Sequence, residues 1–378
     1  MNNCLNAKKV GLFRFYTQKG LIFMKKTALT LISLLLIFST LLISCGDKPI
    51  IDEIEPSEED IKVVGSVGGK DILYDELRCL CLNYREVLAN KYGDDIWENE
   101  TTAAEHLPEL EAYVLQALKV NAAALIAAER NGISIDSKEI KEQINLELNR
   151  FSEDLVNEIR VEKEDEEYSA SRKEINTAYA EYLKDYHLTD RYNRYTLSVS
   201  ACIQQLMQKF ASDGTVSNDD EVIKKYIKEN FVRTLHIFIR NDTGESVDAN
   251  RKLAEDCLDD LRSGRATMKQ LIGSAVNDDH FLTTMNGYYF TRGEYFKEYE
   301  DSVYALEIGK YSDVVTSSEG FYVIQRLELE DDYINKNFEA LKSQYQTSYV
   351  NSLIEDVKNE IEFVFNDYGK ALDLTKLK

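Results

Sequence analysis

The sequence predicts an α+β protein in which a helical part is interrupted by a segment that contains β-strands. Two stretches rich in β-branched and aromatic residues, 232–239 and 317–324, predict strands. On both sides of this segment, apolar residues recur at intervals of three and four, the spacing of amphipathic helices. Because such helices need a partner for their apolar face, we expect one helical domain with a second domain inserted into it.

Residues 1–44 predict an export signal. Met24 is followed by two lysines and then by an apolar run over residues 28–43, and we interpret Met24 as the true start. The run ends in Leu-Ile-Ser-Cys, which resembles the lipobox of bacterial lipoproteins and implies lipid attachment to Cys45. The alternative is a transmembrane anchor, but about 16 apolar residues fall short of the roughly 20 that span a bilayer.

The chain beyond the signal is strongly acidic. Six of the 45 basic residues and none of the 67 acidic ones precede Cys45, so 39 basic residues remain against 67 acidic ones, a net charge of −28. Such a surface repels nucleic acid and anionic lipid, so we expect no nucleic-acid partner. It is typical of a soluble exported protein, and attraction of basic unfolded chains is the alternative reading.

Residues 45–61 contain two prolines among acidic residues and predict a flexible tether. A helical domain follows over residues 62–230. It opens with a valine-rich strand and a glycine turn at 63–72, which resembles the opening of SurA/PrsA-type foldases.

Two long helices are predicted next. One carries Leu110, Val114 and Leu118. In the other, apolar residues lie three or four apart throughout: Ile140, Ile144, Leu148, Phe151, Leu155 and Ile159. Such a stripe is usually part of the core, and a client-binding groove is the alternative.

The last segment, 331–378, predicts a helix that packs back on the helical domain. Its apolar residues also lie three or four apart: Phe338, Leu341, Tyr345, Tyr349, Leu353 and Val357. The helical region before residue 230 is the natural partner for that face.

The cysteines and histidines do not form a recognisable metal or disulfide motif. Cys79 and Cys81 are two residues apart on a predicted helix and point to different faces. The sequence contains no C-x-x-C pair, and its four histidines are scattered. We therefore predict no structural zinc, no disulfide framework and no cofactor.

Several motifs between residues 231 and 330 resemble the parvulin family of peptidyl-prolyl isomerases. His236-Ile237-Phe238 is similar to a His-Ile-Leu-like triplet in the family's first strand, and residues 287–293 resemble its glycine-aromatic-Phe segment. The resemblance implies a four-stranded antiparallel sheet with surrounding helices. With the flanking helices, it implies a SurA/PrsA-like helical chaperone domain that carries an inserted parvulin-like domain.

The resemblance also implies the catalytic residues. His236 matches the first-strand histidine, and Asp278 aligns with the Cys/Asp position beside the substrate amide, although Asn277 and Asp279 are adjacent candidates. Tyr322 stands where the family's last strand usually carries a second histidine. Tyrosine donates one hydrogen bond and accepts others, so it can preserve part of a histidine network without the geometry of imidazole.

The substrate-binding residues follow from the same resemblance. Tyr295 falls where a methionine commonly forms the floor for the proline ring, Tyr299 where a phenylalanine stacks on that ring, and Phe290 at the aromatic position of the glycine-aromatic-Phe segment. Isomerisation crosses a barrier of about 18–20 kcal/mol set by amide resonance, and it needs neither metal nor nucleophile. An apolar pocket and polar groups that favour the twisted amide suffice.

Three functions remain open. The first is a lipid-anchored extracytoplasmic foldase that binds unfolded exported polypeptides and isomerises X-Pro bonds. The second is a chaperone whose parvulin-like domain is catalytically inactive, which the tyrosines at 295 and 322 favour. The third is a surface lipoprotein with an adhesive or assembly role. The oligomeric state also stays open, and a homodimer is one of the alternatives.

Overall fold

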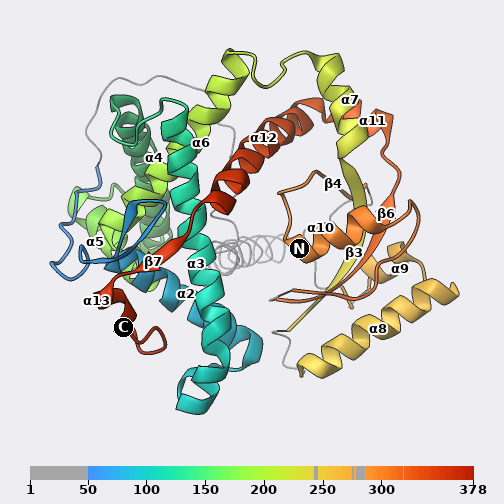
Figure 1. The fold of residues 1–378 in the computed structure, drawn as a ribbon, viewed down its shortest axis with the longest axis horizontal. Helices are drawn as coiled ribbons and strands as arrows, with labels where there is room; N and C mark the ends of the chain where they lie inside the picture. Colours follow the sequence, from blue (N-terminus) through green and yellow to red (C-terminus); the bar gives the residue numbers. More distant parts are fainter. Residues whose placement is uncertain (1–49, 242–245, 275, 278–285, 318) are drawn as a thin grey trace, which may run out of the picture.

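The computed structural model describes residues 50–241, 246–274, 276–277, 286–317 and 319–378. Figure 1 shows two halves: one contains helices α2 to α6 and a small sheet, and the other contains a four-stranded sheet. Helix α12 (Phe338–Glu360) runs from the second half back to the first. The predicted signal peptide and Cys45 lie outside the described residues, so both stay predictions.

The small sheet brings the two ends of the chain together. Strands β1 (Val63–Val67) and β2 (Lys70–Leu73) form the hairpin that the glycine turn predicts, and β7 (Phe363–Phe365) pairs antiparallel with β1. A Cβ atom at Gly65 would lie 2.6 Å from the Val364 carbonyl oxygen, so this close approach requires glycine. The C-terminal segment thus completes a sheet begun at the N-terminal end of the described chain.

Helices form the core of this first half. Their bounds are α2 (Tyr74–Tyr92), the 3-10 turn η1 (Asp94–Trp97), α3 (Glu100–Arg130), α4 (Lys138–Lys163), α5 (Arg172–Asp185) and α6 (Asp190–Ser212). Helix α3 lies centrally and contacts α2, α6 and α12. Among the described residues it is the one helix long and apolar enough to span a membrane, and half of its apolar window is buried inside the protein.

The apolar stripe of α4 is part of the core. Ile140, Leu148, Leu155 and Ile159 are buried, and α5 and α6 pack against the helix. The last three of these residues share an apolar cluster with Ile175, Tyr179 and Leu183. The spacing left two interpretations of this stripe open, core packing and a client-binding groove. For these four residues the structure shows core packing.

The predicted tether is bound to the helical half over part of its length. We call residues 50–54 the N-terminal strap. Within it, Ile51 is only 1% exposed and belongs to the apolar cluster of α4 and α5. Flexibility was expected because the segment is acidic and proline-containing, but Ile51 is buried and the strap backbone is hydrogen-bonded to Asn149, Asn176 and Asp190. Residues 50–54 are thus docked on the helical half, and the flexible tether over 45–61 stays a proposal.

Helix α12 buries two different faces. Its first turns contact α7 (Asp220–Asn230) and α11 (Asp331–Lys336), where Phe338 and Leu341 are buried. Farther on, Val350, Ile354 and Val357 pack with α3 and α6, whereas Tyr349 is 43% exposed. Of the predicted stripe, Leu353 and Val357 pack against this core as expected, and only the prediction for Tyr349 is wrong, because the partner of α12 changes along its length.

The second half contains a four-stranded antiparallel sheet in the order β4-β3-β6-β5. The strands are β3 (Val232–Arg240), β4 (Tyr288–Phe290), β5 (Val315–Thr316) and β6 (Gly320–Leu327). In the central pair, Phe238 lies opposite Tyr322 and His236 opposite Ile324. This confirms the α+β fold with a four-stranded sheet.

Helices cover both faces of this sheet. Helices α8 (Val247–Ser263) and α9 (Met268–Ile272) pack on the face that carries Leu235, Ile237 and Ile239. Helix α10 (Lys297–Ala305) packs on the other face, which carries Thr234, His236 and Phe238. Since side chains alternate along a strand, β3 separates an apolar layer from a layer that contains polar and aromatic groups.

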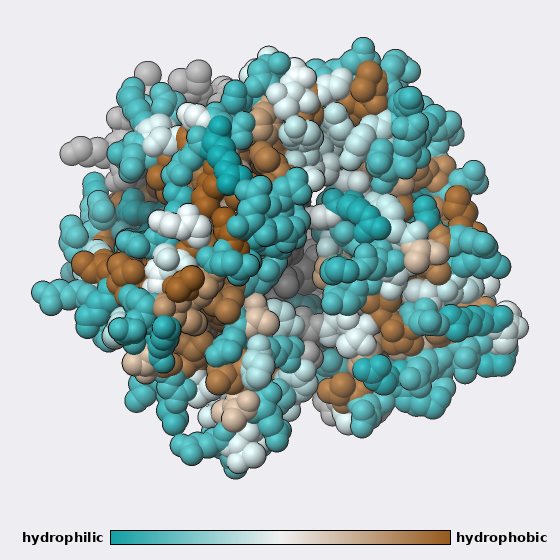
Figure 2. Space-filling model, in the orientation of Figure 1, coloured by the Kyte–Doolittle hydropathy of each residue, from teal (hydrophilic) through white to brown (hydrophobic). Residues whose placement is uncertain are grey.

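The face of the molecule shown in Figure 2 is mostly hydrophilic. On this face, hydrophobic residues form separate patches among hydrophilic ones, several of them over the helical half.

We keep the division of the chain into domains at 62–230, 231–330 and 331–378 as a proposal, with the C-terminal segment completing the helical domain.

Candidate functional site

The candidate site lies on the polar face of β3, centred on His236. This histidine is 3% exposed and lies between Thr234 and Phe238 on the same face of the strand. The glycine at 287 approaches the backbone of β3 so closely that a Cβ atom there would lie 2.4 Å from the Thr234 carbonyl oxygen. Its φ of +80° also favours glycine. This turn brings β4, and with it Tyr288, beside His236.

A chain of hydrogen bonds fixes the imidazole. Nδ1 of His236 lies 2.9 Å from the hydroxyl oxygen of Tyr299, and that hydroxyl lies 3.0 Å from Oγ1 of Thr234. Tyr299 comes from α10 and is fully buried, and burial raises its pKa well above the ordinary value for tyrosine. The phenol therefore keeps its proton, donating to one neighbour and accepting from the other.

Aromatic rings surround the histidine. Tyr288 stacks flat on the imidazole, with ring centroids 4.9 Å apart and an interplanar angle of 8°. Tyr322 meets the imidazole edge to face at 5.1 Å and stacks on Phe238 at 4.3 Å. Phe296 lies 5.6 Å from Tyr322. Four of the rings around the network are only partly buried, and we call them the aromatic rim: Tyr288, Tyr295, Phe296 and Tyr322.

Two carboxylates hold the loop that carries Tyr295. One oxygen of Glu300 accepts the backbone N–H groups of Gly293, Glu294 and Tyr295 at 2.8, 2.9 and 2.9 Å. Glu294 accepts the Thr291 N–H at 2.9 Å and a side-chain N–H of Gln344, in α12, also at 2.9 Å. Burial raises the pKa of Glu294 to about 7. The loop is therefore fixed both to its own domain and to α12.

Asn277 connects a loop to the centre of the sheet. Its Oδ1 accepts the backbone N–H of Phe238 at 3.0 Å, and its Nδ2 donates to the Ile272 carbonyl at 3.3 Å. The side chain is 8% exposed, so this contact lies inside the domain. Asp278, the residue aligned with the position beside the substrate amide, lies outside the described residues, and its role stays a prediction.

The structure brings together the five other residues that the sequence singled out. Tyr295 and Tyr322 belong to the aromatic rim, and His236 lies beneath it. Tyr299 and Phe290 are 0% and 1% exposed, so both lie beneath the surface in this structure. Their predicted contact with a proline ring stays a prediction, and the present geometry gives them the position of supports under Tyr295.

Sequence reasoning missed four residues of the site around His236. Thr234 could have been found, because it precedes His236 by two residues and must share its face of a strand. Tyr288 and Phe296 depend on how β4 and α10 meet β3, which no local pattern encodes. Asn277 was only an alternative for Asp278, and its bond to the Phe238 N–H had no sequence signal.

Other reactive groups do not gather at the site. Among the described residues, no group of three or more His, Cys, Asp and Glu side chains is arranged to hold a metal ion. Four cysteines of the described part are buried free thiols: Cys79, Cys81, Cys202 and Cys257. Burial raises the pKa of Cys79 to about 12 and of Cys202 and Cys257 to about 11, so these thiols stay protonated near neutral pH.

Comparison with known proteins identifies this half of the molecule. Residues 236–328 match the family profile of the rotamase, PPIC-type PPIase domain. The match covers β3 from His236 onward and continues through β6; it includes His236, Tyr299 and the aromatic rim, whereas Thr234 lies two residues before it. The chain therefore contains a parvulin-type peptidyl-prolyl isomerase domain.

Curated relatives extend the similarity to the rest of the chain. A foldase protein PrsA from Caldanaerobacter subterraneus subsp. tengcongensis is 25% identical over 326 residues, which cover 84% of this chain and 86% of the relative. A foldase protein PrsA from a Geobacillus species is 27% identical over 246 residues, covering 59% and 82%. Over most of its length the chain is thus similar to PrsA foldases, and it contains a parvulin-type domain.

A solved structure of foldase protein PrsA from Streptococcus pneumoniae aligns over 84% of this chain and 99% of that chain, at 18% identity and a TM-score of 0.31. A score this low supports no further argument.

Proposed function

We propose that the protein is a lipid-anchored folding factor outside the cytoplasm that binds unfolded exported polypeptides and accelerates the isomerisation of their X-Pro bonds. The observation that carries this proposal is the chain from His236 through Tyr299 to Thr234, beneath a rim of partly exposed aromatic rings. The PrsA-type relatives and the lipobox at Cys45 support the location and the anchor.

The geometry suits catalysis by shape and hydrogen bonding. A proline ring needs an apolar surface, and the aromatic rim offers one made of Tyr288, Tyr295, Phe296 and Tyr322. His236 and Tyr299 act as positioning residues that keep Tyr288 and Tyr322 in fixed orientations. Rotation about the amide passes through a twisted state that has lost its resonance, and a rigid pocket lowers the barrier by binding that state more tightly than the planar one.

The proposal assigns the polar contact with the substrate amide to Asp278. Its neighbour Asn277 accepts the backbone N–H of Phe238 in β3. The mechanism needs no proton transfer, since no covalent bond is made or broken. We therefore expect His236→Ala to lower kcat/KM for a proline peptide by about 10-fold or more, equivalent to about 1.4 kcal/mol.

Tyr322 favours a second candidate function, a folding factor whose parvulin-type domain is catalytically silent. Its ring stacks on Phe238 and presents an edge to His236, an arrangement that differs chemically from a pair of histidines. Under this alternative, the domain serves as a scaffold and the helical domain carries the function.

A protease-coupled assay with proline peptides separates the two candidates. The mature protein, His236→Ala and Tyr322→His are compared with Tyr333→Phe, a control whose ring stacks on Tyr289 outside the site. Activity in the wild type that falls in His236→Ala supports the isomerase. Activity that appears only in Tyr322→His supports the silent scaffold. The folding-factor proposal itself is tested by measuring whether the protein suppresses the aggregation of a denatured protein. A protein that neither suppresses aggregation nor shows isomerase activity would rule out both candidates.

A further inference from the structure

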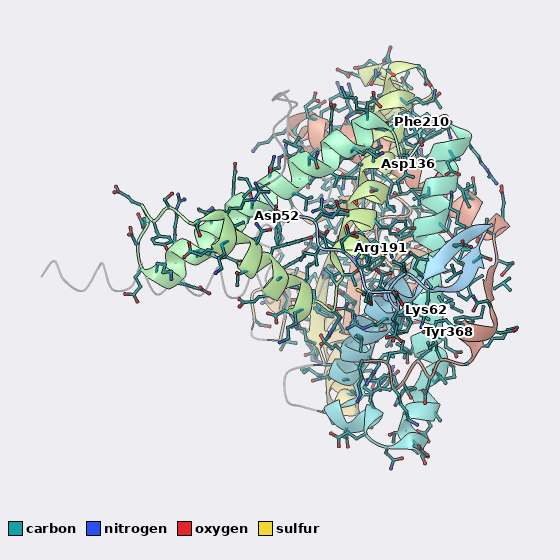
Figure 3. All side chains as sticks on the ribbon, turned by 90° about the vertical axis from the view of Figure 1, so that its left-hand side faces the viewer. Asp52, Lys62, Asp136, Arg191, Phe210 and Tyr368 are labelled. Carbon is teal, nitrogen blue, oxygen red and sulfur yellow. The ribbon has the colours of Figure 1, made fainter. Side chains whose placement is uncertain are left out.

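The N-terminal strap lies in a groove between α4, α5 and α6. Figure 3 shows α4 and α5 projecting from the rest of the molecule as a pair, with Asp52 near the base of the projection and Arg191 closer to the body. The strap residues belong to no helix or strand. The strap residues and the helix residues that they contact are 99 to 136 positions apart in the sequence. One segment of the chain therefore docks on another.

Side chains of the groove bind the backbone of the strap. Asn176 makes two such contacts, accepting the Asp52 N–H at 2.7 Å and donating to the Ile50 carbonyl at 3.2 Å. Asn149 accepts the Ile50 N–H at 3.2 Å, and Asp190 accepts the Ile54 N–H at 3.1 Å. Because these contacts involve main-chain groups, any extended polypeptide can supply them.

Two side chains of the strap add selectivity. Ile51 is 1% exposed and inserts among the apolar residues of α4 and α5, whereas Ile50 and Ile54 are 41% and 43% exposed. Asp52 pairs with Arg172, and both of these side chains are more than half exposed. The groove therefore has one deep aliphatic pocket and, next to it, a positively charged position.

The surface of α5 beside the strap is hollowed. An open depression of about 550 Å³ lies there, lined by Asp52, Arg172, Lys173, Asn176, Thr177 and Ala180. The strap itself buries one large side chain and is held by a few hydrogen bonds at the surface. Segments with so few buried contacts open at low free-energy cost, so the strap is suited to exchange with another chain.

We propose that this groove is a peptide-binding site that the N-terminal strap occupies in cis. The partner that replaces the strap is an extended polypeptide segment with an aliphatic residue followed by an acidic one. The inference deepens the proposed binding of unfolded polypeptides and rests on it, since it names where such a chain binds and which side chains it presents. Because the strap is covalently attached, its high effective concentration limits access to chains that bind more tightly or in many copies.

The test uses the full mature protein and a fluorescent peptide with the sequence of residues 48–56. Ile51→Asp places a charge in the aliphatic pocket and should expel the strap, whereas Ile50→Asp makes the same change at an exposed neighbouring position. By fluorescence anisotropy, we expect the peptide to bind Ile51→Asp at least 10-fold more tightly than the wild type, and Ile50→Asp to behave like the wild type. Equal binding to all three proteins, or no binding to Ile51→Asp, would overturn the proposal.

Two further measurements locate the bound peptide. Adding Asn176→Ala to Ile51→Asp should weaken binding at least 10-fold, because two main-chain contacts are lost; unchanged binding would place the peptide elsewhere and overturn the proposal. Ile51→Ala, which adds no charge, should give an intermediate gain, and circular dichroism confirms that each variant is folded. Isomerase activity of these variants is expected to equal that of the wild type, so the peptide site and the isomerase can each fail separately.

Discussion

The two faces of β3 hold the inserted domain together in different ways. On one face, Leu235, Ile237 and Ile239 pack against α8 and α9 by apolar contact alone. On the other, Thr234 and His236 share the hydroxyl of Tyr299 under partly exposed rings. One strand thus separates a layer that supplies stability from a layer that fixes the orientation of a few side chains. Substitutions on the two faces should therefore affect different measurements.

The largest effect is expected on the apolar face. Ile237 is fully buried, so Ile237→Ala removes packed methyl groups and leaves a cavity. We expect a loss of about 2–5 kcal/mol in the free energy of unfolding, measured by urea denaturation. Isomerase activity per folded molecule should change little. A fall in kcat without a loss of stability would contradict the division between the two faces.

The second largest effect is expected on the pH dependence of stability, through Glu294 in the loop that carries Tyr295. The pKa of Glu294 is raised to about 7 in the folded protein, above an unfolded value near 4.3, so the folded state holds this proton more tightly. The contribution of Glu294 to the free energy of unfolding should therefore be greatest below about pH 4.3. It should fall by up to about 3 kcal/mol as the pH rises to about 7.

Glu294→Gln should flatten that part of the curve of unfolding free energy against pH. Some slope remains, because burial also raises the pKa of Glu76 to about 7. The matched control is Glu298→Gln, an exposed position on α10. If both variants had the same pH profile as the wild type, burial of Glu294 would not be the cause.

A third effect tests the polar face directly. Tyr299→Phe removes only the hydroxyl that joins His236 to Thr234. We expect kcat for a proline peptide to fall about 10-fold, or about 1.4 kcal/mol, with KM nearly unchanged. The control is Tyr304→Phe in the same helix, whose hydroxyl binds the Asn230 carbonyl at 2.8 Å. A similar loss in both variants would show that α10 needs its hydroxyls only for structure.

The smallest effect is expected at the end of the hydrogen-bond chain. Thr234→Val keeps the shape of the side chain and leaves Tyr299 with His236 as a partner. We expect a decrease of about threefold in kcat and about 1 kcal/mol in stability. An effect larger than that of Tyr299→Phe would mean that Thr234, and not Tyr299, orients the imidazole.

The sequence was most informative where alternation along a strand decides the outcome. The β-branched and aromatic residues of 232–239 correctly predicted a strand, along which residues 235, 237 and 239 alternate with Thr234, His236 and Phe238, and the parvulin resemblance placed Tyr299, Tyr295 and Tyr322 near His236. Contacts that depend on the packing of distant elements were not predictable. These include the change of partner along α12 and the bond from Asp52 to Asn176, 124 residues apart. The roles of Cys45 and Asp278 stay predictions.

The pairing of β7 with β1 sets the order in which the chain can fold. Asn366 donates to the Val63 carbonyl at 2.6 Å across 303 residues of sequence, so the third strand of the small sheet is added only when nearly the whole chain is present. The sheet of the inserted domain joins residues within about one hundred positions and can form earlier. A chain that emerges N-terminus first can therefore complete its parvulin-type domain before its helical half.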